Sequence, residues 1–224
     1  MKRFGIFVLF ACAVLVTGSA VHAAELDPLV QSWLNAQTNL KTWSADFTQT
    51  RTLKSLTQPL TATGHVWFAA PNRFRWELGE PAQTIAVRAP KELLVIYPRL
   101  KRVEHFPLVG QTGQWRDALA LLEAGFPHSE AEMQNQYNIL SQKVVDGICK
   151  LTLQPKSESA RRMMPQIEID FDTKTFALRG TELHFADGST MRNDFKNPEL
   201  NPKLDEKLFA PEIVDYKNVE PLKK

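Results

Sequence analysis

Apolar and polar residues alternate along most of the chain between residues 43 and 106, which is typical of half-buried β-strands. The clearest stretch is residues 73–78, where Phe74, Trp76 and Leu78 take one parity and charged residues take the other. Short breaks rich in proline, glycine and asparagine separate the alternating runs. The pattern predicts six strands, at residues 43–53, 60–69, 73–79, 83–88, 92–97 and 99–106.

Alternation returns in the second half of the chain. Asp187 and Gly188 form a standard hairpin signal there. The tail beyond Pro198 is expected to be largely irregular, with Leu208 and Phe209 docking on the sheet. Five further strands are predicted, at residues 136–145, 147–155, 166–172, 175–186 and 189–196.

Helical spacing occurs in three places. Asp27 and Pro28 form an N-cap and a first-turn proline, and they predict an amphipathic helix over residues 26–42. A broad apolar stripe results from the helical spacing of Leu26, Leu29, Val30, Trp33, Leu34 and Leu40, and Gln37 stands at the same spacing. A second helix is predicted within residues 113–125. A third starts at Ser129, which has Glu132 three residues on, as in a capping box.

This order of elements predicts a mainly β (α+β) fold. Short connections suit antiparallel neighbours, because parallel strands need long crossovers. A sheet of about eleven strands is large enough to curl, and partial closure into a barrel shortens its exposed edges. A half-closed barrel has an interior, which either side chains or a ligand would fill.

The first 23 residues have the pattern of a secretory signal peptide. Lys2 and Arg3 precede an uncharged apolar run that ends in small residues, and cleavage is expected after Ala23. An uncleaved membrane anchor is the alternative. Lipid attachment at Cys12 is disfavoured, since bulky Phe10 stands in a poor lipobox.

The mature chain, residues 24–224, is expected to be one domain. Without Lys2 and Arg3, 25 basic residues remain against 25 acidic ones, so the totals give no indication of nucleic-acid binding. Cys149 is then the one cysteine left and cannot form an internal disulfide. We expect it to be a small buried apolar residue.

Catalytic signatures are weak, and neither a cofactor nor a metal is expected. The sequence contains no GxSxG elbow, no phosphate-binding loop and no HExxH motif. Glu168, Asp170 and Asp172 alternate as in a solvent-facing strand. The histidines of the mature chain are far apart, at positions 65, 105, 128 and 184.

Large apolar residues recur on several predicted strands, and periodicity permits either an ordinary core or the wall of an apolar chamber. The pattern of apolar residues alone leaves both interpretations open. The residues concerned are Trp43, Phe47, Trp67, Phe74, Trp76, Leu78, Ile85, Val87, Leu94, Ile96 and Tyr97.

The order and spacing of several segments resemble the periplasmic outer-membrane lipoprotein carrier family, LolA. The resemblance starts with WSADFTQT, GHVWFAAPNRFRWELGEPAQTIAV and ELLVIYPRLKRVE, and it continues more weakly to KLFAP. It covers essentially the whole mature chain. It implies a half-open antiparallel barrel with helices forming a lid over an apolar cavity. It also implies a periplasmic carrier that takes acylated lipoproteins from an inner-membrane transporter to an outer-membrane acceptor in a Gram-negative bacterium.

From this resemblance we assign hypothetical roles to nine residues, in a protein expected to be a monomer. The cavity wall is assigned to Phe47, Phe74, Trp76, Leu78, Ile85 and Ile96, and the lid to Trp115, Leu119 and Leu122. One departure matters, because family members commonly have a basic residue that latches the lid where this chain has Ala70. Arg73 or Arg75 could replace it only within reach of the lid. A carrier or sensor of another lipid therefore stays an alternative, and so does a filled barrel with a structural or enzymatic role.

Overall fold

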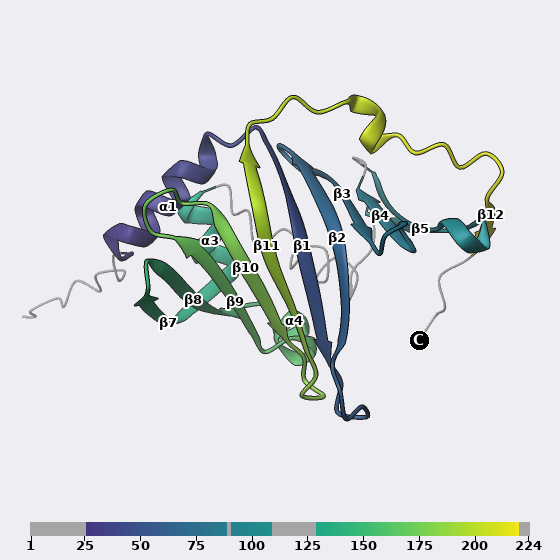
Figure 1. Ribbon diagram of the computed structural model, residues 1–224. Coiled ribbons are helices and arrows are strands. Elements are labelled where there is room, and N and C mark those ends of the chain that lie inside the picture. The colour runs from purple at the N-terminus through teal and green to yellow at the C-terminus, as the bar shows by residue number, and fades with distance from the viewer. Residues whose placement is uncertain (1–25, 89–90, 109–128, 220–224) are drawn as a thin grey trace, which may run out of the picture.

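The computed structural model describes residues 26–88, 91–108 and 129–219. A single curved sheet of twelve strands dominates it, with a few short helices, as Figure 1 shows. The strands are β1 (Thr42–Thr52), β2 (Leu60–Ala69), β3 (Arg73–Leu78), β4 (Thr84–Arg88), β5 (Glu92–Tyr97), β6 (Arg102–Pro107), β7 (Tyr137–Val145), β8 (Ile148–Pro155), β9 (Gln166–Asp172), β10 (Leu178–His184), β11 (Thr190–Leu200) and β12 (Lys217–Val219). The predicted mainly β, half-open antiparallel architecture is confirmed.

The strand order is β12-β6-β5-β4-β3-β2-β1-β11-β10-β9-β8-β7. Chain neighbours pair antiparallel within each half of the sheet, as the short connections predicted. Antiparallel pairing of β1 with β11 joins the two halves and sets Phe47 opposite Phe195. The twelfth strand, β12, was not predicted, and it pairs parallel with β6 at the edge of the sheet.

Among the described residues, four helical segments accompany the sheet in addition to α1 (Pro28–Thr38): α3 (Glu130–Gln136), α4 (Glu158–Met163), η1 (Pro98–Leu100) and η2 (Glu206–Phe209). The Asp27 cap of α1 is confirmed, because its side chain accepts a hydrogen bond from the Leu29 amide at 2.8 Å. The helix ends at Thr38, before the predicted end at residue 42, since β1 has already begun at Thr42. Ser129 caps α3 as expected, and α4 was not predicted.

Helix α1 packs its apolar stripe on one face of the sheet, which we call the inner face. Trp33 is fully buried and stacks on Phe171 of β9, with ring centroids 4.8 Å apart and planes 7° apart. Cys149 of β8 is buried in the same cluster, and burial raises the pKa of its thiol to about 11. The expectation that Cys149 is a buried apolar residue is confirmed.

The opposite, outer face of β4 to β6 has an apolar cluster of its own, formed by Val87, Leu94, Ile96 and Val103. A C-terminal arm, residues 201–216, runs from the end of β11 to β12 (Figure 1). Its residues Ile213 and Tyr216 pack against this outer cluster. The expected docking of the tail is confirmed at Phe209, which is buried beneath the Arg73 guanidinium, 4.9 Å from the ring centroid.

Several predicted features lie outside the described residues. They are the signal peptide of residues 1–23 and the helix within residues 113–125, with the lid residues Trp115, Leu119 and Leu122. In the part of the chain that the structure does describe, no helix is both long enough and apolar enough to cross a bilayer.

Candidate functional site

Aromatic rings from three strands gather on the inner face near the middle of the sheet. The Phe47 and Trp76 ring centroids lie 4.2 Å apart, and Phe195 stands edge-on to Trp76 at 6.1 Å. Trp43 extends the group, at 5.2 Å from Phe195. Tilted and edge-on contacts at these separations are favourable for aromatic pairs. We call Trp43, Phe47, Trp76 and Phe195 the aromatic cluster.

A glycine lets this cluster span three strands. Gly64 of β2 lies opposite Phe47 of β1 on one side and Leu78 of β3 on the other. A Cβ atom at position 64 would come within 2.5 Å of the Phe47 ring and 2.1 Å of the Glu77 carbonyl oxygen. The missing side chain therefore leaves room for Phe47 to lie across β2 and reach Trp76.

Four of the six predicted wall residues share the inner face. Phe47 and Phe74 are 2% and 6% exposed, whereas Trp76 and Leu78 are half-buried and pack against the same cluster. The alternation in residues 73–78 thus predicted the inner face of β3. We call the inner face of β1 to β6, with its apolar residues, the inner wall.

Ile85 and Ile96 do not belong to the inner wall, so the prediction was wrong for their position. Ile85 of β4 is in register with Glu77 of β3, which faces outward like Arg75. Ile96 of β5 is in register with Ile85 and therefore faces the same way. Both isoleucines pack in the outer cluster. Strands β4 and β5 have apolar residues on both parities, and these residues pack in a different cluster on each face. For such strands, only the register with β3 shows which alternate residues face inward.

Sequence reasoning missed other residues of the inner wall. Leu93 of β5 and Phe106 of β6 are buried there, in register with each other. Phe195 lay within a predicted strand, but its place beside Phe47 depends on the β1–β11 pairing. No local signal reveals that contact.

The arginines of β3 face outward, which agrees with the charged parity of residues 73–78. Arg73 forms an ion pair with Glu206 of η2. Arg75 pairs with Glu77 at 2.6 Å and donates to the Leu208 carbonyl at 3.2 Å. Both guanidinium groups therefore hold the C-terminal arm on the outer face, on the side of the sheet opposite to the aromatic cluster.

Arg88 brings a positive charge to the inner wall. It lies in register between Phe74 of β3 and Leu93 of β5, and the side chain is half-buried. Burial lowers the pKa of Arg88 from its ordinary value, which still leaves a guanidinium charged at neutral pH. The sequence did not single out this residue.

The outer face holds a groove of about 430 Å³ beneath the C-terminal arm. Its apolar floor contains Ile85 and Ile96, Arg75 of β3 also lines it, and the arm supplies the remaining walls. Ile213 and Tyr216 of the arm line the groove and also pack on the outer cluster. We regard this groove as a feature of how the arm docks, because its apolar floor is continuous with that packing.

Comparison with known proteins finds relatives in sequence and in fold. A model of the family described as "Outer membrane lipoprotein carrier protein LolA" matches residues 38–212. An outer-membrane lipoprotein carrier protein of Chromohalobacter salexigens is 26% identical over 182 residues, which are 81% of each chain. One of Bordetella avium is 25% identical over 96% of this chain and 98% of its own. In fold alone, the chain resembles an uncharacterized conserved protein from Thermus thermophilus, with a TM-score of 0.51, 11% identity, and coverage of 86% and 99%.

Proposed function

Because the chain belongs to the outer membrane lipoprotein carrier protein LolA family, we propose that it binds the acyl chains of lipoproteins on its inner wall and carries them between membranes. The observation that carries this proposal is the aromatic cluster, which is apolar and includes half-buried Trp76, with half-buried Leu78 beside it on the same strand. The cluster offers apolar contact and no catalytic group, so we propose binding without chemistry.

The route of the cargo is part of the same proposal. We place the mature protein, residues 24–224, in the periplasm after removal of the signal peptide. There it would receive lipoproteins from an inner-membrane transporter and hand them to an outer-membrane acceptor, acting as a monomer. The names of the two relatives, both outer-membrane lipoprotein carriers, support this route.

Energetics explain why such a carrier is needed. Each methylene withdrawn from water contributes about 0.8 kcal/mol, so a lipid with two or three acyl chains does not cross water unaided on a useful timescale. A carrier must also release its cargo. We propose that the segment with Trp115, Leu119 and Leu122 competes with the acyl chains for the inner wall. Competition of this kind weakens binding, because the free energy needed to displace the lid is subtracted from the binding free energy of the acyl chains.

A series of synthetic lipopeptides with shortened acyl chains tests the proposal. Each pair of methylenes removed from the buried part of a chain is expected to weaken binding by about 1.6 kcal/mol, roughly 15-fold. Isothermal titration calorimetry on the purified protein measures the dissociation constants, with the unacylated peptide as control. Equal affinities across the series, or equal affinity for the unacylated peptide, would contradict acyl-chain binding.

A carrier of another amphiphile is the second candidate, and one observation favours it. Ala70 stands where the family commonly has its basic residue. Mass spectrometry of organic extracts from the periplasmic protein separates the two functions. Acylated lipoprotein is the expected result in the co-purified material, whereas free lipid as the main component would favour the second candidate.

A further inference from the structure

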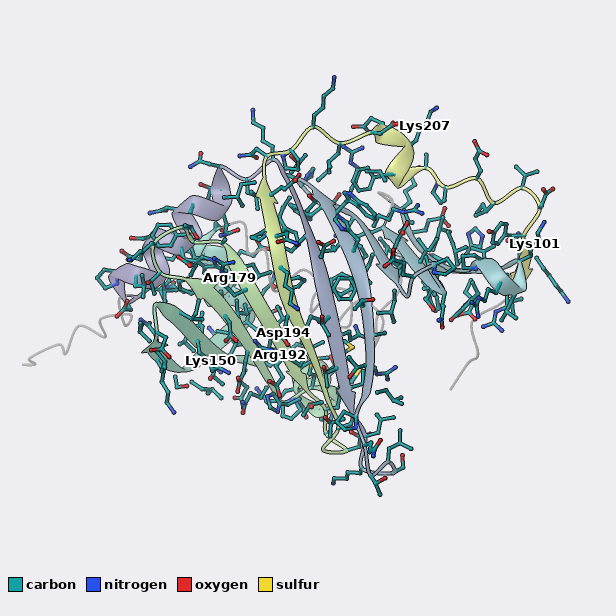
Figure 2. All side chains as sticks on the ribbon, viewed as in Figure 1. Lys101, Lys150, Arg179, Arg192, Asp194 and Lys207 are labelled. Atoms are coloured by element: carbon teal, nitrogen blue, oxygen red, sulfur yellow. The ribbon has the colours of Figure 1, made fainter. Side chains whose placement is uncertain are left out.

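A polar cluster occupies the outer face of the other half of the sheet, away from the inner wall. Glu168 of β9 and Glu182 of β10 are direct cross-strand partners, and His184 follows Glu182 by two residues on the same face. Like charges opposite each other destabilise a strand pair unless something compensates. Figure 2 labels Lys150, Arg192 and Asp194, which lie over this part of the sheet.

The three side chains converge on one point. His184 Nε2 lies 3.6 Å from Glu168 Oε1 and 3.7 Å from Glu182 Oε1, and all three atoms lie within 4.8 Å of one another. Zinc binds imidazole nitrogen and carboxylate oxygen at about 2.0–2.2 Å, which places adjacent tetrahedral ligands roughly 3.3–3.6 Å apart. The two distances from His184 Nε2 are already close to that spacing.

The surroundings hold both carboxylates in one orientation. Glu168 Oε2 accepts from Lys150 at 3.0 Å, and Glu182 Oε2 lies 3.9 Å from Arg192, so Oε1 of each carboxylate faces His184. The Gln166 amide also donates to Glu168 Oε1 at 3.0 Å. Such outer contacts orient metal ligands in known sites.

The imidazole provides an independent observation. His184 Nε2 is buried from solvent and makes no hydrogen bond, although it points between two carboxylate oxygens. A buried polar nitrogen that makes no hydrogen bond is costly. An ion between the three atoms would bind the nitrogen and add to the charge compensation that Lys150 and Arg192 already give the facing glutamates.

We propose that Glu168, Glu182 and His184 form a zinc site on the outer face of β9 and β10, with a fourth position open to water. The His184 side chain is 31% exposed, although its Nε2 atom is buried from solvent. Sequence motifs could not show it, because the ligands come from two paired strands. The row of acidic residues on β9 was expected to face solvent, yet Asp170 is buried and pairs with Arg192 at 2.7 Å.

Titration of the purified, untagged protein with zinc chloride in a calorimeter tests the site. We expect one zinc ion per chain, and at least tenfold weaker binding in His184→Gln and in Glu182→Gln. His105→Gln is the matched control, since His105 contacts one carboxylate, Glu92, at 2.8 Å on another part of the outer face. The control is expected to bind zinc as tightly as the unaltered protein.

Three results would overturn the proposal: no zinc bound by the unaltered protein, full zinc affinity in His184→Gln, or an equal loss in His105→Gln. The last would identify adventitious binding to surface histidines. Thermal unfolding without zinc verifies that each variant is folded. Because the inner wall is untouched, lipopeptide binding by His184→Gln is expected to stay normal, which separates this test from that of the proposed function.

Discussion

Replacing Trp76 with glutamate is expected to weaken binding of a diacylated lipopeptide about a hundredfold. Trp76 is a half-buried member of the aromatic cluster, in contact with Phe47 and edge-on to Phe195. An acyl chain on the inner wall would cover a carboxylate at this position. Removing an unpaired carboxylate from water costs several kcal/mol, and about 2.7 kcal/mol already corresponds to a hundredfold change. Calorimetric titration with the lipopeptide measures the effect.

Ile85→Glu is the matched control for that experiment. Ile85 is half-buried like Trp76 and lies on the neighbouring strand, but its side chain is on the outer face. This variant adds the same charge and is expected to keep lipopeptide affinity within a factor of three. Circular dichroism verifies that both variants are folded. Normal binding by Trp76→Glu with loss of binding in Ile85→Glu would place the acyl chains on the outer face and contradict the proposed site.

Replacing Trp33 with alanine is expected to lower the free energy of unfolding by about 3–5 kcal/mol. The Trp33 side chain is fully buried and stacks on Phe171, so truncation loses both the apolar contact and the aromatic pair. The contact also holds α1 on the inner face of β9. Urea denaturation followed by circular dichroism measures the change.

Asn35→Ala provides the comparison within the same helix. Asn35 is exposed on α1, and substitutions at such positions usually change stability by less than about 0.5 kcal/mol. If Trp33→Ala cost no more than Asn35→Ala, α1 would not be anchored through this stacking. The two variants together therefore measure what the buried stripe of the helix contributes.

Local patterns predicted those features whose causes are local. The alternation of residues 73–78 predicted the two faces of β3, because one of its faces is charged. The sequence Asp27-Pro28 predicted the start of α1, since an N-cap acts through the next few residues. The eleven predicted strands correspond to β1 through β11.

Features that depend on distant parts of the chain could not be predicted in this way. Ile85 and Ile96 were placed on the wrong face, because apolar residues stand on both parities and the C-terminal arm covers the outer one. Phe195 was missed as a neighbour of Phe47, since only the pairing of β1 with β11 brings them together. The three-residue β12 was missed because a strand so short has no periodicity to recognise.

The position of β1 between β2 and β11 also constrains how the molecule is assembled. The first strand of the sheet is made early, but one of its two partners is the second-last strand of the chain. The aromatic cluster cannot form before Phe195 has been synthesised. Closing so long a loop makes folding slow. Until the loop closes, the edge of β1 offers unpaired backbone groups to other chains, so nascent molecules would need protection from aggregation during that interval.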